Sequence, residues 1–414
     1  QPSAELGYPL VPRTLRVDYL DWPRLPELFP FSSPGVTTSR DTGLVDIERF
    51  SLEKRIKRYL DPSVSDEQIH QTDPVLMTST SGFDAKTTRK SILEGNGKGD
   101  FIRYLYRPFD LRWLYWHPTT KLLDRNRQEY FANLRDDNIF LFTTGRTRKS
   151  TIEPPIATHS LCDYNCMDSG ARGFPLYLYD ADPGQLFKAR HENLSPLARR
   201  YLAQTGGDAP ALFHHTLAIL HAPAYRLENS GGLRQDWPRL PLPAEGAALA
   251  ASAALGRTVA VLLDPEQPVA GVTHGEPRPD LRDIAVFDFA GPQPALAVDA
   301  GWGHGGRDGV VMPGRGRVEE RLNAAGEPVV NVYLNANACW RGVPVAVWGY
   351  TLGGYPVLKK WLSYREAALL GRPLRIDEVE EFRNIARRIV ALLALGDALD
   401  ANYWQAASLH SGVG

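Results

Sequence analysis

Hydrophobic residues recur along this chain with two periods, and each period predicts a kind of element. Alternation by twos predicts strands, and spacing by threes and fours predicts helices. Because the two kinds do not alternate regularly, we expect an α+β fold of mixed sheets with flanking helices. The predicted strands are 103–116 (a pair), 139–142, 174–179, and a hairpin of 329–334 and 343–348 that turns at 335–337. The predicted helices are 46–60, 86–93, 195–202, 211–220, 244–256, 357–369 and 377–399.

The densest apolar pattern, Arg103–Trp116, is aromatic on both faces and still contains charges. Pro108 fixes its own φ and keeps Arg107 out of the helical region, so a turn is predicted between two strands. The turn would bring Arg107, Asp110 and Arg112 together. Since buried charges persist only when paired, an Arg–Asp–Arg bridge that fixes this corner is expected, with direct ligand contact as the alternative.

The step Arg107-Pro108-Phe109-Asp110, followed by Arg112-Trp113, resembles the C-terminal region of Type ISP restriction-modification enzymes and related adenine-specific DNA methyltransferases. Further segments resemble the same region in the same order: Ser33–Asp41, Phe174–Tyr179, Leu220–Arg226, Pro238–Leu242 and Gly353–Leu362. The resemblance implies a target-recognition module that binds double-stranded DNA. It also implies a methyltransferase core in the same polypeptide, which binds S-adenosylmethionine and against which the C-terminal helices pack.

Charge locates the predicted DNA surface. The formal net charge is −1, so a nucleic-acid surface must be a local patch. Residues 101–150 contain ten Lys or Arg against five Asp or Glu, among eleven aromatic residues. Arginines that neutralise phosphates, beside aromatic side chains, are typical of such surfaces. The predicted DNA-binding residues are Arg107, Arg112, Arg125, Arg127, Arg146, Arg148 and Lys149. For the loops at 124–127 and 145–150, a merely solvated surface is the alternative.

Catalytic chemistry is not evident in the sequence. Gly301–Gly306 matches G-x-G-x-x-G, but the helix-breaking stretch 309–314 follows, so a loop is predicted. A self-contained nucleotide- or S-adenosylmethionine-dependent enzyme remains an alternative that a helix directly after Gly306 would favour, and a protein-interaction scaffold is another. The string Glu153–Ile156 lacks the aromatic residue of a base clamp. We predict no catalytic, cofactor-binding or metal-binding residues; His214, His215 and His221 are expected at helix surfaces or caps.

Composition divides the chain into three predicted segments. Residues 1–95 form a junction from the methyltransferase core, 96–245 a first recognition subdomain, and 246–414 a second one with a β-hairpin and C-terminal helices. No signal peptide or apolar run long enough to span a membrane is expected, and three cysteines without zinc-site spacing indicate reduced thiols. A cytoplasmic location and a fragment of a longer polypeptide are therefore expected.

Overall fold

The computed structural model describes residues 15–95, 97–118, 120–145, 153–167, 171–179, 189–306 and 310–410. The chain divides into two compact units. Unit 1 comprises 1–24, 146–156 and 200–414, and unit 2 comprises 25–145 and 157–199. Both contain sheets and helices, which confirms the predicted α+β class. The three predicted segments remain a prediction, because compactness does not test which segments function together.

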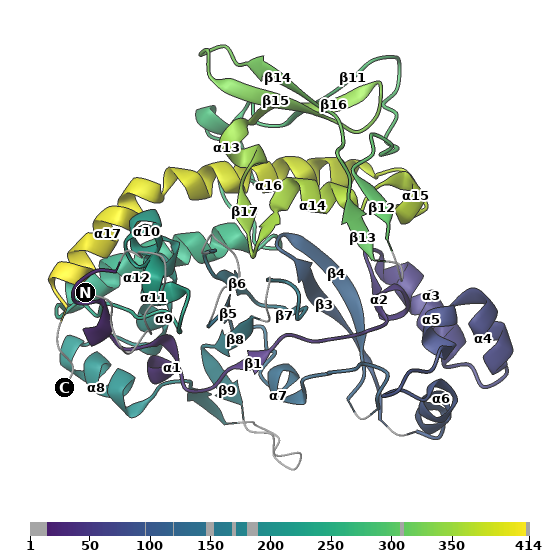
Figure 1. The fold of residues 1–414 in the computed structure, drawn as a ribbon, viewed down its shortest axis with the longest axis horizontal. Coiled ribbons are helices and arrows are strands. Elements are labelled where there is room, and N and C mark those ends of the chain that lie inside the picture. The colour runs from purple at the N-terminus through teal and green to yellow at the C-terminus, as the bar shows by residue number, and fades with distance from the viewer. Residues whose placement is uncertain are drawn as a thin grey trace. The chain divides into compact units, whose positions relative to one another are not determined.

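Unit 2 contains two small sheets, drawn in purple to teal in Figure 1. One has the order β2-β4-β3-β7, and the other β1-β8-β5-β6. Most pairs are antiparallel, and β3 pairs in parallel with β7. The strands are β1 (Ser33–Pro34), β2 (Val45–Asp46), β3 (Asp100–Arg107), β4 (Asp110–Trp116), β5 (Phe140–Thr143), β6 (Ile156–Thr158), β7 (Leu161–Cys162) and β8 (Arg172–Pro175); β9 (Tyr177–Tyr179) and β10 (Arg190–Glu192) form a separate hairpin.

Helices of unit 2 lie mainly beside the β3–β4 pair (Figure 1). They are α2 (Asp41–Leu44), α3 (Arg49–Tyr59), α4 (Asp66–Thr72), α5 (Pro74–Met77) and α6 (Ala85–Leu93), with α1 (Leu25–Leu28) and α7 (Gln128–Phe131) elsewhere in the unit. The predicted helix at 86–93 and strand at 139–142 are confirmed within one residue. The predicted strand at 174–179 is split at Leu176 into β8 and β9.

The predicted turn between β3 and β4 is confirmed. Arg107 pairs with Asp110 across the hairpin, leaving Pro108 and Phe109 as the turn. Phe109 has a φ of 61° and is buried, so a large side chain occupies a backbone conformation that usually requires glycine. Burial of the ring stabilises a turn that is strained on its own. Both faces of the pair are buried near the turn, as the pattern predicted.

Unit 1 is built on a helical layer in which α9 (Ala209–His221) packs against α12 (Gly246–Leu263). Buried His215 joins these helices, since its Nδ1 lies 2.7 Å from Ser252 Oγ and its Nε2 2.8 Å from Pro241 O. His221 is also buried, with Nε2 2.9 Å from Pro155 O. The predicted surface position is therefore wrong for both histidines, because each side chain is buried and forms a hydrogen bond with a backbone carbonyl inside the unit.

The C-terminal helices are α16 (Ile376–Ala394) and α17 (Gly396–Ser408). The helix predicted at 377–399 is confirmed over α16 and is interrupted at Leu395, which separates α16 from α17. The apolar side chains of α16 are covered by this chain, with α12 among its contacts. Helical spacing places Arg387 and Arg388 opposite the apolar residues of α16, yet both are buried. Arg388 Nη1 donates to Val261 O at 2.9 Å in the last turn of α12, where a cation favours the exposed carbonyls.

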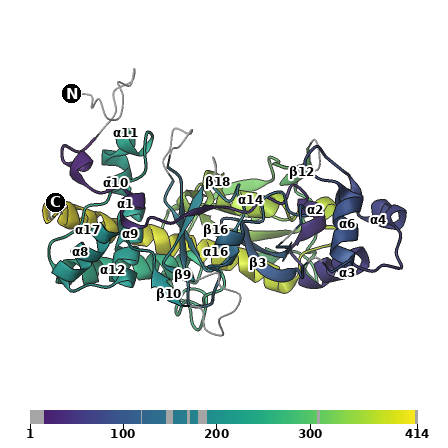
Figure 2. The same cartoon turned by 90° about the horizontal axis from the view of Figure 1, so that it is seen from below.

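A four-stranded antiparallel sheet, order β11-β16-β15-β14, completes unit 1 (Figure 1). Figure 2 shows β16 and α16 of this unit from below. The predicted turn at 335–337 is confirmed, but the second strand begins directly after it and 345–348 is helical. Other elements include α10 (Pro223–Glu228), α11 (Ser230–Leu233), β11 (Val286–Phe289), β12 (Gly303–Gly305), β13 (Val311–Pro313), β14 (Val318–Leu322), β15 (Pro328–Tyr333), β16 (Ala338–Pro344), α13 (Val345–Trp348), β17 (Thr351–Leu352), β18 (Tyr355–Pro356), α14 (Val357–Ser363) and α15 (Ala367–Leu370), while α8 (Pro196–Thr205) spans the boundary of the units.

One helix in the described part of the chain, α12, is long and apolar enough to cross a membrane, with a mean hydropathy of 1.6. The sequence analysis expected no such run. Eight residues of α12 are buried, and the helix packs against α9. A core helix of a folded unit meets the same length and composition criteria.

Candidate nucleic-acid interface

Arg107 and Arg112 both lie at the β3–β4 corner and are ion-paired. Arg112 Nη2 is 2.6 Å from Asp110 Oδ2, as predicted. Arg107 Nη1 is 2.9 Å from Asp163 Oδ1, a residue that the sequence analysis did not single out. Both guanidinium groups also lie over the Tyr106 ring, 4.2 and 4.0 Å from its centroid. The arrangement supports the structural interpretation of this corner over direct ligand contact.

Asp163 is the centre of a buried polar network. Tyr104 donates its hydroxyl to Asp163 Oδ2 at 2.6 Å, and burial raises the pKa of both groups. Arg107 offsets part of this rise for the carboxyl group. Tyr106 donates its hydroxyl to Asp41 Oδ2 at 2.7 Å, at the end of the Ser33–Asp41 segment. The network therefore joins the hairpin to a segment far away in the sequence.

The Ser33–Asp41 segment lies between two other loops of unit 2. Val36 N donates to Cys162 O at 2.9 Å, and Tyr164 N donates to Val36 O at 2.8 Å. Gly35 permits this approach, because a Cβ there would lie 2.7 Å from the backbone of Asp163. On the other side, Thr37 and Arg125 exchange backbone hydrogen bonds of 3.1 and 2.9 Å. The segment thus positions the predicted 124–127 loop.

Backbone strain gathers in the same region. Among the described residues, four non-glycine residues have a positive φ, and three of them, Ser39, Phe109 and Arg127, belong to unit 2. Trp116 of β4 donates Nε1 to Asn126 O at 2.6 Å, which fixes the loop that contains Arg127. Strained residues held by their surroundings are common at functional sites.

Three arginines meet beside this loop. Arg127 Nε donates to Gly35 O at 3.1 Å, and Arg172 Nε donates to Ser32 Oγ at 2.8 Å. Burial lowers the pKa of Arg127; Glu129 offsets this in part, and the nearby charges of Arg125 and Arg172 lower the pKa further. Arg125 is exposed and its side chain makes no hydrogen bond or ion pair with any described residue. We call Arg125, Arg127 and Arg172 the arginine cluster.

Like charges held together favour binding of an anion, since the anion removes their mutual repulsion. The sequence analysis predicted two members of the arginine cluster and missed Arg172, which lies in β8 just before the Phe174–Tyr179 segment. Tyr164, which is 38% exposed, offsets a small part of the lowering of the pKa of Arg127. The predicted residues Arg146, Arg148 and Lys149 lie outside the described residues.

The Gly301–Gly306 stretch does not have the geometry of a nucleotide loop. Gly303–Gly305 forms β12, which pairs with β13, and residues 307–309 lie outside the described part. The buried carboxylate of Glu366 accepts backbone N–H groups from Gly301, Trp302 and Gly303 at 3.1, 2.7 and 3.2 Å. A bound phosphate would need these backbone N–H donors. The Glu366 side chain already occupies them.

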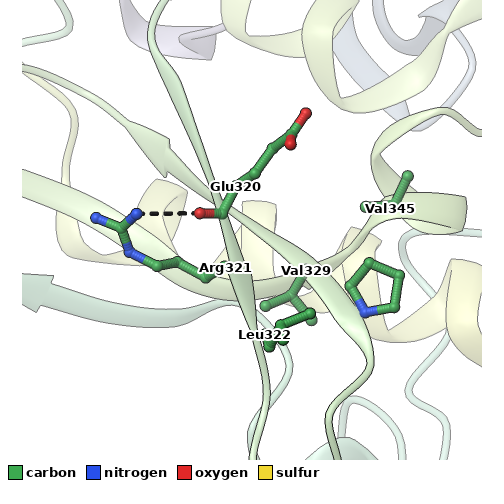
Figure 3. Close-up of a pocket in the computed structure, with 6 residues that line it drawn as sticks. Glu320, Arg321, Leu322, Val329 and Val345 are labelled. Carbon is green, nitrogen blue, oxygen red and sulfur yellow. Dashed lines mark hydrogen bonds between the residues drawn. The ribbon is translucent and has the colours of Figure 1, made fainter.

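Two surface hollows lie in unit 1. One has a volume of about 460 Å³ and is lined by the six residues drawn in Figure 3, which are Glu320, Arg321, Leu322, Pro328, Val329 and Val345. The other, of about 380 Å³, includes Arg226, whose guanidinium donates to Leu220 O and His221 O at the end of α9. Within the described ranges, no group of three metal-ligating side chains is present, and the three cysteines are buried and form no disulfide.

Comparisons with known proteins place these features in a family. The chain is similar in fold to a nuclease-deletion mutant of the Type ISP restriction-modification enzyme LlaGI with a DNA substrate mimic (TM-score 0.58, 15% identity), covering 94% of this chain and 34% of that one. It is similar to the ATP-dependent Type ISP enzyme LlaBIII bound to DNA (0.60, 14%, covering 91% and 24%). It also resembles DrdV in a DrdV–DNA complex (0.58, 19%, covering 90% and 36%).

The chain therefore spans about a third or less of the first two of these relatives. A comparison with curated proteins finds no match. The family model of the Type ISP C-terminal specificity domain matches residues 27–388, which include most of both units and all the motif segments described above. This chain belongs to the Type ISP C-terminal specificity domain family.

Proposed function

We propose that this chain binds duplex DNA and selects the target site for a single-polypeptide restriction-modification enzyme. The arginine cluster is the observation that carries the proposal, because it places three cations near one another on the 124–127 loop and on strand β8, which hydrogen bonds to the Ser32–Thr37 stretch hold in position. The structural relatives support it, since their structures contain DNA or a DNA mimic.

The arginines would have different roles. Arg127 and Arg172 are half-buried and anchored by backbone or hydroxyl acceptors, so they suit phosphates, whose positions vary little with sequence. Arg125 is exposed and suits a contact to a base edge, where a guanidinium can bind guanine through two hydrogen bonds. Arg107 and Arg112 would position the loops from the ion-paired corner. Arg146, Arg148 and Lys149 remain predicted DNA contacts.

The chemistry of methylation would belong to the rest of the polypeptide. We propose an adenine-specific methyltransferase core that binds S-adenosylmethionine, with this chain as its recognition region in the cytoplasm. The Gly301–Gly306 loop is a poor site for that cofactor because Glu366 occupies its donors. Neither an enzyme built on this loop nor a scaffold has a specific structural feature in its favour.

The direct test is fluorescence anisotropy of a labelled duplex across a salt series. Wild type should bind more weakly as the salt concentration rises. R125Q/R127Q should reduce the slope of log affinity against log salt by about 0.9 for each phosphate that the variant no longer neutralises. Arg199→Gln is the matched control, because this exposed arginine of unit 2 is paired with Glu192 at 2.9 Å. Wild type that fails to bind DNA at low salt would overturn the proposal.

A further inference from the structure

Helix α3 presents an unexpected side chain to solvent. Phe50 has the spacing of a core residue, yet it is 76% exposed at the start of the helix. The residues that bury α3 are Leu52, Ile56 and Tyr59. Lys54 and Lys57 follow Phe50 at i+4 and i+7, so the three side chains share one exposed stripe.

Arginines hold the acids of α3 and its surroundings in ion pairs, beginning with Glu53, whose Oε1 lies 2.6 Å from Arg49 Nε. Asp46 and Asp73 are both engaged by Arg55 of the same helix, at 2.7 and 3.4 Å. Lys54 and Lys57 form no ion pair with any described residue. An exposed aromatic side chain therefore stands at the head of a cationic stripe whose charge is open to a partner.

A second group continues the stripe onto the sheet. Trp113 of β4 is half-buried, and the guanidinium groups of Arg49 and Arg103 each lie 4.8 Å from the centroid of its ring. Arg103 is the cross-strand partner of Trp113, and Arg49 is the first residue of α3. Stacking on the Trp113 ring orients both guanidinium groups, and Arg49 Nε also donates to Glu53 Oε1 at 2.6 Å.

We propose that this surface, Arg49, Phe50, Lys54, Lys57, Arg103 and Trp113, is a second contact with DNA that holds the phosphate backbone of the duplex. Lysine ammonium groups suit phosphates as mobile point charges, and the exposed aromatic side chain suits the apolar edges of sugars. The charge of the stripe selects a polyanion as the partner. This inference rests on the proposed function and adds a contact separate from the arginine cluster.

The test uses the full chain and a random-sequence duplex. K54Q/K57Q should reduce the slope of log affinity against log salt by about 1.8, because each phosphate left without its lysine accounts for about 0.9. Phe50→Ala should weaken binding and leave this slope unchanged, because it removes no charge. The control is K86Q/K90Q on α6 of the same unit, whose lysines are 72% and 77% exposed and lie near Glu67 and Glu94; its slope should match wild type.

The outcomes separate this inference from the proposed function. If wild type binds with a salt-dependent affinity and R125Q/R127Q weakens it, while K54Q/K57Q binds like wild type, the α3 surface is not a DNA contact and the proposed function stands. If K86Q/K90Q lowers the slope as much as K54Q/K57Q, only general charge is involved, and the inference is overturned. Wild type that binds no DNA would overturn both.

Discussion

Asp163 Oδ1 lies 2.9 Å from Arg107 Nη1, so the corner between β3 and β4 is closed by a carboxylate 56 residues further along the chain. The same carboxyl group accepts the hydroxyl of Tyr104, and its backbone neighbours hold the Ser33–Asp41 segment. Segments that lie far apart in the sequence thus share one buried acid. Removing the cation that pairs with this acid should therefore disturb both the β3–β4 corner and the Ser33–Asp41 segment.

Replacing Arg107 with Ala should lower the free energy of unfolding by about 3 kcal/mol, because Asp163 would lose the cation that compensates its burial. Chemical denaturation is the measurement. The double variant R107A/D163N should lose less stability than Arg107→Ala alone, because it removes both charges of the ion pair. Arg125→Ala, in the exposed part of the arginine cluster, is the control and should change stability by no more than about 0.5 kcal/mol. An Arg107→Ala variant as stable as wild type would contradict the role of the corner.

Gly35→Ala should displace the Ser33–Asp41 segment, because the new Cβ would lie 2.7 Å from backbone atoms of Asp163 and Tyr164. We expect a loss of stability of roughly 1 to 3 kcal/mol and weaker DNA binding, as Arg127 would lose the carbonyl of residue 35 in its present position. Gly82→Ala is the matched control, since a Cβ there meets nothing within 4 Å. Equal melting temperatures for the two variants would show that the close approach is unimportant.

Glu366→Ala should destabilise the chain by roughly 2 kcal/mol, because the buried N–H of Trp302 and the part-buried N–H groups of Gly301 and Gly303 lose a charged acceptor. The control is Glu320→Ala, whose exposed carboxylate lies on β14. Calorimetric titration of wild type with S-adenosylmethionine should give no binding heat. Binding that disappears on Gly303→Val would instead assign the cofactor to this loop.

Acid should destabilise unit 1 through its buried histidines. Burial lowers the pKa of His215 from 6.5 to about 4, so neutral His215 stabilises the fold above pH 6.5 and this contribution is lost as the pH falls toward 4. The loss is on the order of 3 kcal/mol for this group. His221, with a pKa lowered to about 3, acts in the same direction.

His215→Gln should therefore flatten the pH dependence of the free energy of unfolding between pH 6.5 and 4. His70→Gln, at an exposed position on α4, is the control and should retain the wild-type profile. Urea denaturation over this range measures both. An unchanged slope in His215→Gln would mean that His215 does not cause the acid sensitivity.

Local chemistry explains what the sequence could predict. Pro108 and the flanking aromatic residues suffice to predict the β3–β4 hairpin, because both signals are contained within a few residues. Asp163 was missed because it lies in an irregular stretch, where no hydrophobic periodicity shows that a residue is buried. Its partner Arg107 is also 56 residues away in the sequence. Arg388 looked solvent-exposed by helical spacing, since spacing does not show that the end of another helix lies against that face.

The sequence predicted some residues of the candidate site and missed others, as it did for the fold. Arg125 and Arg127 were identified from a polar, turn-like stretch, whereas Arg172 was missed because it belongs to a strand and meets the others only through tertiary folding. Phe50 has the apolar spacing of the helix predicted at 46–60, and such spacing cannot distinguish a packed ring from an exposed one. Its exposure needed the structure.

The division into units limits how specificity could be exchanged between relatives. Unit 2 consists of two stretches, 25–145 and 157–199, separated by only 146–156 of unit 1. Neither stretch alone contains the Arg107–Asp163 pair, so a chimaera with a crossover between them would mix parental partners at that corner. A transplant bounded near residues 25 and 199 would carry the β3–β4 corner, the arginine cluster and the α3 surface together. It would also bring residues 146–156 of the donor into unit 1 of the recipient.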